Sequence, residues 1–395
     1  MDIQLANRVK RIKPSPTLAV SQRATELKAK GQDIVGLGAG EPDFDTPEHI
    51  KEAAYKAIKE GKTKYTAVDG IPSLREAIAQ KMKDFNHLSY QPDQIIVSTG
   101  GKQCIYNLLQ AIIEEGDEVI IPAPYWVSYP DMVLLADGKP VFIDTDINQR
   151  FKITAAQLEK AITPKTKLLF INSPSNPTGM AYTREELNAL AQVLLKHPQV
   201  LIATDDMYEH ILWTNEPFAN IVNVCPELYE RTIVLNGVSK AYSMTGWRIG
   251  YVCCPVKSIN SAMKNIQSQS TSNPCSIAQA AAEAAVRGPM DTVHKMVSVF
   301  KQRHDYLVDN LNQIPGVQCA KGDGTFYTFP RVQDVIDKMP GINNDLQLAE
   351  HLITTVGLAL VPGSAFGSEG FMRLSFATSM EVLEKAVERM KRAFA

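Results

Sequence analysis

Seven short apolar runs alternate with helical patterns through the middle of the chain, and this alternation limits the fold more than any other feature. The runs lie at residues 94–98, 118–121, 140–144, 167–171, 199–204, 232–235 and 248–252. Most are apolar at consecutive positions, as strands buried on both faces should be. Several are separated by helical stretches, at 102–115, 155–163 and 184–196. The pattern predicts an α/β fold whose mainly parallel seven-stranded sheet carries helices on both faces.

The last third of the chain has a different pattern. A helical stretch over 277–312 is interrupted near Gly288, and it is followed by strand patterns near 324–329, 356–360 and 371–376 and by a helix from 379. A chain of 395 residues is also too long for one small core. We therefore expect an N-terminal arm that joins a smaller α+β domain, a large domain and the small C-terminal domain, over residues 1–45, 46–285 and 286–395.

Local signals mark some helix starts. Ser73 with Glu76, and Thr183 with Glu186, have the spacing of capping boxes. Pro14 and Pro16 predict an extended arm before a helix that ends at Gly31.

Composition and charge exclude several classes of function. Lys and Arg number 41 and Asp and Glu 43, a net charge of −2, which gives no electrostatic case for nucleic acid or an anionic membrane. No apolar run reaches membrane-spanning length, and the first residues do not form a signal peptide. The six cysteines are scattered without a C-x-x-C pair, so no zinc site is indicated and a reducing compartment is favoured. We expect a cytoplasmic protein with no metal.

One lysine among small residues follows the sixth apolar run. Lys240 stands between Ser239 and Ala241, and Arg248 comes eight positions later. A lysine at the mouth of a buried strand loses solvation, so its pKa falls and its neutral amine can add to an aldehyde. Ser239 and Arg248 could hold an anion beside it. A solvated lysine with a structural arginine is the alternative.

Two other strand ends carry polar groups. Residues 97–103 form a strand, a glycine pair and a helix start, which is either a simple turn or a site where backbone N–H groups bind phosphate. Asp205, Asp206, Glu209 and His210 follow a buried strand and could form a metal site or an acid–base device. Asn176 follows another strand and lies in a run of Asn, Pro and Gly residues. By itself, this local composition predicts a turn.

Together these motifs resemble the class I pyridoxal phosphate (PLP) aminotransferases, in the bacterial branch near the aspartate/prephenate aminotransferases. The resemblance runs from Lys13 to the C-terminus. It implies the PLP-dependent aminotransferase fold, with Lys240 as the lysine that joins PLP and shuttles a proton, and Asp205 as the partner of the ring nitrogen. It assigns the other cofactor contacts to Gly101, Lys102, Trp126, Asn176, Tyr208, Ser239, Arg248 and Tyr65. Trp126 is otherwise a core aromatic. Tyr65 would reach the phosphate of a neighbouring subunit, which implies a homodimer with shared active sites.

The substrate contacts follow from the same resemblance. An arginine inside an apolar strand is costly unless it meets a carboxylate, so Arg373 is either in a structural salt bridge or bound to a substrate. The resemblance assigns Arg373 to the substrate α-carboxylate, with the backbone at Gly40. Lys102 would bind a second carboxylate and Lys13 would serve prephenate recognition, while Trp126 and Asn176 also border the substrate.

The expected activity is transamination between an amino acid and a 2-oxo acid. Aspartate plus 2-oxoglutarate to oxaloacetate plus glutamate is the expected reaction, with prephenate to arogenate as a possible second one. The alternatives are an aminotransferase for alanine or aromatic amino acids, a PLP lyase, and a non-catalytic ligand-sensing module with the same fold.

Overall fold

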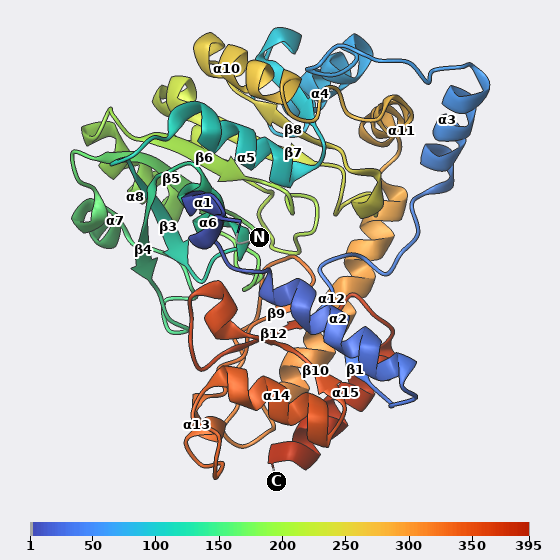
Figure 1. The fold of residues 1–395 in the computed structure, drawn as a ribbon, viewed down its shortest axis with the longest axis vertical. Helices are drawn as coiled ribbons and strands as arrows, with labels where there is room; N and C mark the ends of the chain where they lie inside the picture. Colours follow the sequence, from blue (N-terminus) through green and yellow to red (C-terminus); the bar gives the residue numbers. More distant parts are fainter. Residues whose placement is uncertain (1–2, 395) are drawn as a thin grey trace.

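A seven-stranded sheet forms the centre of the computed structural model, which describes residues 3–394 (Figure 1). Its strand order is β2-β8-β7-β6-β5-β3-β4, and only β8 runs antiparallel to its neighbours. The strands are β2 (Ile95–Ser98), β3 (Glu118–Ala123), β4 (Lys139–Asp144), β5 (Thr166–Asn172), β6 (Leu201–Asp205), β7 (Thr232–Gly237) and β8 (Gly250–Cys253). The predicted fold class is therefore confirmed. Strand β8 starts two residues later than predicted because Arg248 takes a left-handed conformation, with φ 56°.

Both faces of this sheet are covered by helices, as the consecutive apolar positions predicted. Along β5, Leu168 and Phe170 face one apolar cluster, while Leu169 and Ile171 face the other. The first cluster is closed by α5 (Gly101–Ile112), α6 (Ser128–Leu135) and α10 (Lys257–Ser268). The second is closed by α4 (Pro72–Asp84), α7 (Ala155–Ala161), α8 (Arg184–Lys196), α9 (Ile221–Val224) and α11 (Ser276–Arg287), and α3 (Glu48–Lys59) lies against α11.

Two small sheets form the lower part of the molecule in Figure 1. One pairs β1 (Val35–Gly36) in parallel with β10 (Leu358–Ala359), and the other has the antiparallel order β11 (Val361–Pro362), β12 (Met372–Ser375), β9 (Tyr327–Thr328). The helices of this part are α2 (Pro16–Ala29), α12 (Asp291–Leu311), α13 (Gln333–Ile336), α14 (Asp345–Thr355) and α15 (Met380–Phe394), and a short α1 (Asn7–Lys10) precedes them. The N-terminal segment thus joins the C-terminal elements through β1. The proposed division at residues 45 and 285 stays a prediction.

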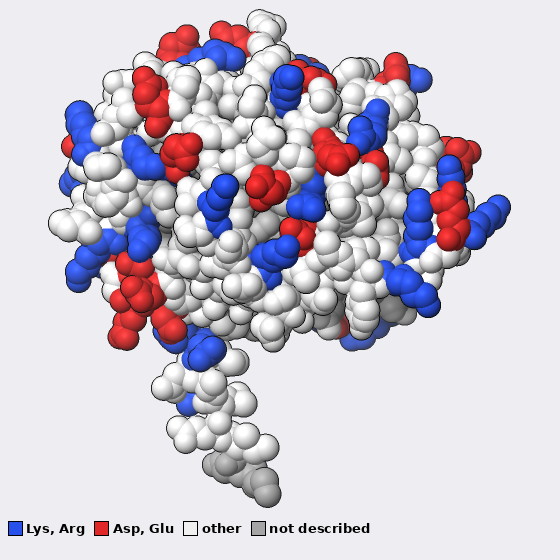
Figure 2. All heavy atoms as spheres, turned by 90° about the horizontal axis from the view of Figure 1, so that it is seen from above, with Lys and Arg blue, Asp and Glu red and all other residues white. Residues whose placement is uncertain are grey.

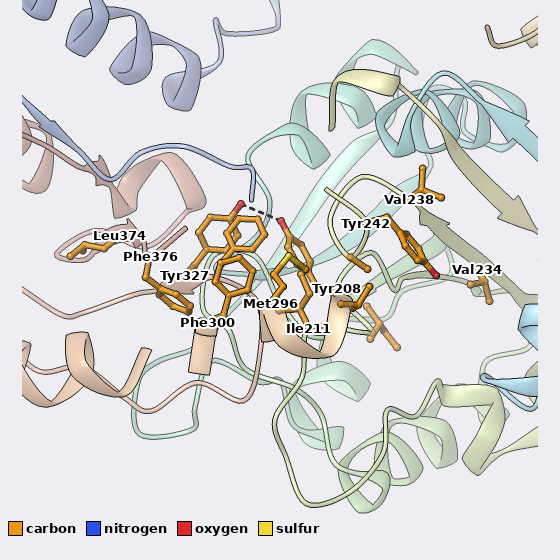
Figure 3. Packing of buried hydrophobic residues seen from close by; sticks show 14 of the residues in the cluster. Tyr208, Ile211, Val234, Val238, Tyr242, Met296, Phe300, Tyr327, Leu374 and Phe376 are labelled. Carbon is orange, nitrogen blue, oxygen red and sulfur yellow. Dashed lines mark hydrogen bonds between the residues drawn. The ribbon is translucent and has the colours of Figure 1, made fainter. Parts of the chain in front are cut away.

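Apolar contacts run without a break from the large sheet to the lower part. Phe300 of α12 packs beside Phe326 and Phe376, within the cluster that also holds Ile211 and Val234 (Figure 3). Nearby, Arg303 of α12 forms two hydrogen bonds, of 2.8 and 2.9 Å, with the carboxylate of Asp43. This pair fastens the N-terminal segment to the long helix.

Two of the predicted local signals are wrong. Helix α4 begins at Pro72 without a side-chain cap, because the Ser73 hydroxyl donates instead to Glu283 at 2.6 Å. Pro16 is the first residue of α2 rather than part of an extended arm, since proline fits the first helical turn. The Thr183–Glu186 capping box is confirmed.

Charges of both signs are interspersed on the face seen in Figure 2. Among residues 3–394, no helix combines the length and apolar character needed to cross a bilayer.

The lack of a side chain at Gly250 allows β8 to lie directly against the start of α5. A Cβ on Gly250 would lie 2.4 Å from the backbone nitrogen of Gly101 and 2.5 Å from the carbonyl carbon of Gly100. Because these neighbours are backbone atoms, they cannot move aside as a side chain can.

We therefore expect Gly250→Ala to lower the free energy of unfolding by about 1–3 kcal/mol, as overpacking does. Urea denaturation measures this change. Gly246→Ala is the matched control, since no atom lies within 4 Å of its added Cβ, and its effect should stay within about 0.5 kcal/mol. Equal effects of the two variants would contradict the close approach.

Candidate active site

A cavity of about 570 Å³ opens where the carboxyl ends of the parallel strands meet the lower part of the molecule. Ligand sites of α/β sheets are found at this edge. Eleven of the thirteen residues predicted from the sequence line it: Gly40, Gly101, Lys102, Trp126, Asn176, Asp205, Tyr208, Ser239, Lys240, Arg248 and Arg373.

Lys240 lies in the loop after β7, with its amine inside the cavity. Its Nζ donates a hydrogen bond of 2.6 Å to the carbonyl oxygen of Gly40. Burial lowers the pKa of Lys240 to about 8, and the positive charges of Arg373 and Arg248 act in the same direction. A sizeable fraction of this amine is therefore neutral near neutral pH, as a nucleophile or a base requires.

Asp205 ends β6 and is buried at the cavity wall. Its Oδ2 accepts a hydrogen bond of 2.5 Å from the Tyr129 hydroxyl, and its Oδ1 lies 3.4 Å from the backbone nitrogen of Met207. Burial raises the pKa of Asp205, while these two hydrogen bonds and the charge of Lys240 oppose the rise. The side chain is placed to meet a protonated group in the cavity.

The start of α5 and the Arg248 side chain form a concave anion site. Gly100 precedes the helix with φ 82°, and a Cβ there would lie 2.3 Å from Nη2 of Arg248. Arg248 is held by a 2.9 Å hydrogen bond from Nη1 to the carbonyl oxygen of Thr245. Buried Ser239 and Gly101 complete the lining. Helix N–H groups, a hydroxyl and a guanidinium are a donor set suited to phosphate.

Arg373 is buried without a carboxylate partner among the described residues. It donates to Asn176 Oδ1 at 3.0 Å and to the Gly38 carbonyl oxygen at 2.8 Å, and its Nε has no hydrogen bond. Its guanidinium lies 4.4 Å from the centroid of the Tyr327 ring. None of the ion pairs among residues 3–394 includes Arg373, so the alternative of a structural salt bridge is wrong. A buried guanidinium of this kind is ready for an anionic ligand.

Trp126, Lys102 and Tyr208 border the same space from three sides. The Lys102 amine lies 5.1 Å from the centroid of the Trp126 ring, and burial and the charge of Arg248 lower its pKa. The Tyr208 hydroxyl lies 3.2 Å from that of Tyr327, and the dashed line in Figure 3 marks this hydrogen bond. Burial raises the pKa of Tyr208 well above its ordinary value, so its hydroxyl keeps its proton.

Two predicted site residues lie outside this cavity. Lys13 lines a neighbouring cavity of about 480 Å³ that shares Lys102 and Arg248 with the first. Tyr65 stands in the loop between α3 and α4 with 91% of its surface exposed. The structure therefore does not bring Tyr65 into the site of its own chain.

Sequence reasoning missed several residues of the cavity. The lining also includes Thr17, Leu18, Ser21, Glu41, Asn172, Thr245 and Tyr327, and Tyr327 lies against Arg373. Tyr129 does not line the cavity, but it donates a hydrogen bond to Asp205. Trp126 precedes α6, which begins at Ser128, so no helical spacing links Tyr129 to Trp126, and the sequence pattern gives no signal for Tyr129.

The carboxylates near Asp205 already have hydrogen-bond or ion-pair partners within the protein. Glu209 pairs with Lys81 and accepts hydrogen bonds from Asn86 and Asn236, and Asp206 accepts one from Asn220. The part of the chain that the structure describes contains no cluster of three or more His, Cys, Asp or Glu suited to a metal ion.

Residues 32–390 match the family described as aminotransferase class I and II, and the chain belongs to this family. Within this family, the chain is similar to enzymes named as aspartate/prephenate aminotransferases. It is 57% identical to the aspartate/prephenate aminotransferase of Nitrosomonas europaea, over 98% of this chain and 99% of that protein. It is 53% identical to the one from Cereibacter sphaeroides, over 98% of both.

Solved structures give the same assignment. The aspartate aminotransferase of Rhizobium meliloti superposes with a TM-score of 0.96 at 46% identity, over 100% of this chain and 99% of that one. The Thermus thermophilus aspartate aminotransferase with maleate superposes with a TM-score of 0.93 at 43% identity, over 99% of this chain and 100% of that one. The predicted family is confirmed.

The lowered pKa of Lys240 has a measurable consequence in the cofactor-free protein. Only the neutral amine reacts with trinitrobenzenesulfonate, so the labelling rate of Lys240, followed by peptide mass spectrometry, should reach half its maximum near pH 8. Arg373→Gln should move this midpoint upward because it removes a repelling positive charge. Arg373→Lys, which keeps the charge, is the control. A midpoint near the ordinary lysine value of 10.5 would contradict the burial of the amine.

Proposed function

We propose that this aminotransferase uses PLP to transfer the amino group of aspartate to 2-oxoglutarate, yielding oxaloacetate and glutamate, and that it also converts prephenate to arogenate. One observation carries the proposal. An amine with a lowered pKa, a buried carboxylate and a buried guanidinium without a counter-ion line one cavity, at Lys240, Asp205 and Arg373. The names of the relatives support the choice of substrates.

The residues of the cavity fit PLP group by group. The start of α5, Ser239 and Arg248 suit its phosphate, and the lack of a side chain at Gly100 lets the Arg248 guanidinium lie against the start of α5. The remaining contacts are Asp205 for the ring nitrogen, Asn176 and Tyr208 for the ring oxygen, Trp126 for the ring face and Lys240 for the aldehyde. When bound, PLP supplies that aldehyde and a ring that accepts the electron pair left on the substrate Cα.

The protein's own groups then move and hold protons. Lys240 Nζ, as a neutral amine, accepts the proton from the substrate Cα and can return it. Asp205, an acceptor in a buried setting, holds a proton on the ring nitrogen. The protonated hydroxyl of Tyr208 donates a hydrogen bond to the ring oxygen.

Substrate carboxylates are assigned to the cations of the cavity. Arg373 binds the α-carboxylate. Lys102, whose amine lies over the Trp126 ring, binds the second carboxylate. Lys13, which lines the adjoining cavity, is assigned to the recognition of prephenate. The dicarboxylate maleate, in the name of the Thermus thermophilus structure, supports a site for two carboxylates.

The exposed Tyr65 supports a homodimer. Its 91% exposure leaves its hydroxyl free to reach the phosphate site of a second subunit. We further propose a cytoplasmic location, because the cysteines of the described chain form no disulfide.

Steady-state kinetics with aspartate, prephenate, alanine and phenylalanine as amino donors test this function. The highest kcat/KM is expected with aspartate, and Lys240→Ala should abolish turnover and the visible absorbance of the bound cofactor. A preference for alanine or phenylalanine would favour the alternative aminotransferases. Cofactor binding without turnover of any amino acid would favour a ligand-sensing module.

Arg373 and Lys102 can be separated by substrate choice. Arg373→Lys should lower kcat/KM by about 10²–10³-fold for aspartate and alanine alike, because both carry the α-carboxylate and lysine cannot bind it bidentately. Lys102→Gln should lower kcat/KM for aspartate and leave alanine nearly unchanged. An equal loss with both substrates in Lys102→Gln would contradict its assignment to the second carboxylate.

A further inference from the structure

The hydrogen bond between Tyr129 and Asp205 is buried at both ends. The Tyr129 side chain is 2% exposed and Asp205 is 8% exposed, and the hydroxyl donates to Oδ2 at 2.5 Å. The other contact of the carboxylate, from the Met207 backbone nitrogen to Oδ1, is much longer at 3.4 Å. Tyr129 therefore provides the short hydrogen bond of this carboxylate.

The Tyr129 ring is held so that its hydroxyl stays at this point. It stacks on Phe170 of β5, with centroids 4.5 Å apart and planes 12° apart. Trp126 meets its edge at 5.4 Å. Phe170 pairs in register with Ala203 on β6, two residues before Asp205. The stack and the carboxylate thus rest on neighbouring strands, which fixes the donor relative to the acceptor.

The electrostatic setting explains why such a donor is needed. Burial favours the protonated form of Asp205, and the Tyr129 hydroxyl gives the strongest opposing contribution, ahead of the Met207 N–H and the charge of Lys240. The Lys240 contribution disappears whenever that amine is neutral, as catalysis requires. The hydroxyl does not depend on the state of Lys240.

We propose that Tyr129 is a positioning residue that holds Asp205 ionised and occupies Oδ2, so that Oδ1 is presented to the ring nitrogen of the cofactor. This inference rests on the proposed PLP function. Tyr129 does not touch the substrate, and it acts through Asp205. A tyrosine that only fills the core would also lose stability on removal of its hydroxyl, so stability alone does not distinguish the two roles.

Cofactor analogues distinguish them. The full-length protein, freed of cofactor, is reconstituted with PLP and with 1-deaza-PLP, in which carbon replaces the ring nitrogen, and the ratio of the two dissociation constants is measured. The wild type should bind PLP more tightly. Tyr129→Phe should reduce this ratio about tenfold, because the carboxylate loses a hydrogen bond to a charged group and its orientation.

Two further variants make the test decisive. Tyr182→Phe is the matched control, since it removes the hydroxyl of a half-buried tyrosine that accepts a 3.0 Å hydrogen bond from the Ile153 backbone nitrogen. It should lose stability without changing the ratio. Phe170→Leu keeps the Tyr129 hydroxyl but removes its stacking partner, so the ratio should fall by about threefold, and this variant decides the question if Tyr129→Phe does not fold.

The possible outcomes distinguish failure of the Tyr129 inference from failure of the proposed PLP function. A ratio unchanged within twofold in Tyr129→Phe, or in Phe170→Leu where Tyr129→Phe does not fold, would assign Tyr129 to the core alone and leave the PLP function intact, provided that the wild type discriminates normally. A wild type that binds neither compound, or binds both equally, would overturn the pairing of Asp205 with the ring nitrogen and this inference together.

Discussion

Burial of unlike charges in one cavity is the constraint on which the site depends. Four cationic groups, of Lys102, Lys240, Arg248 and Arg373, line a space where Asp205 and Glu41 supply the anionic ones. Desolvation and the positive charges of Arg373 and Arg248 keep the Lys240 pKa low, while Arg373 is itself buried with no carboxylate partner among the described residues. The excess of positive groups suits a phosphate and a carboxylate, which are the two anions that the proposed reaction brings in.

The sheet edge explains why so much of the site could be predicted from the sequence. Asp205 ends β6, Asn176 follows β5 and Lys240 follows β7, and parallel neighbouring strands bring their carboxyl ends together. Each of these residues comes one to five positions after an apolar run that is recognisable by itself. The fold class was predictable for the same reason, since alternating apolar strands and helices permit few architectures.

Contacts between distant segments were not predictable. The Ser73 hydroxyl meets Glu283 across the helix pair instead of capping its own helix, and no local pattern encodes that choice. Tyr129 is only three residues from Trp126 in the sequence. Its hydrogen bond to Asp205, however, depends on the register of β5 against β6. Tyr65 remains a prediction because its proposed partner belongs to a second chain.

The segment between β1 and α3 contributes to the site mainly through its backbone. The carbonyl oxygen of Gly38 accepts from Arg373 and that of Gly40 accepts from Lys240. Only Ala39 separates the two glycines that accept from Arg373, the proposed anchor of the substrate, and from Lys240, the proposed acceptor of its proton. A displacement of this short segment would therefore change the hydrogen bonds of both Arg373 and Lys240. The main chain here mechanically couples substrate binding at Arg373 to proton transfer at Lys240.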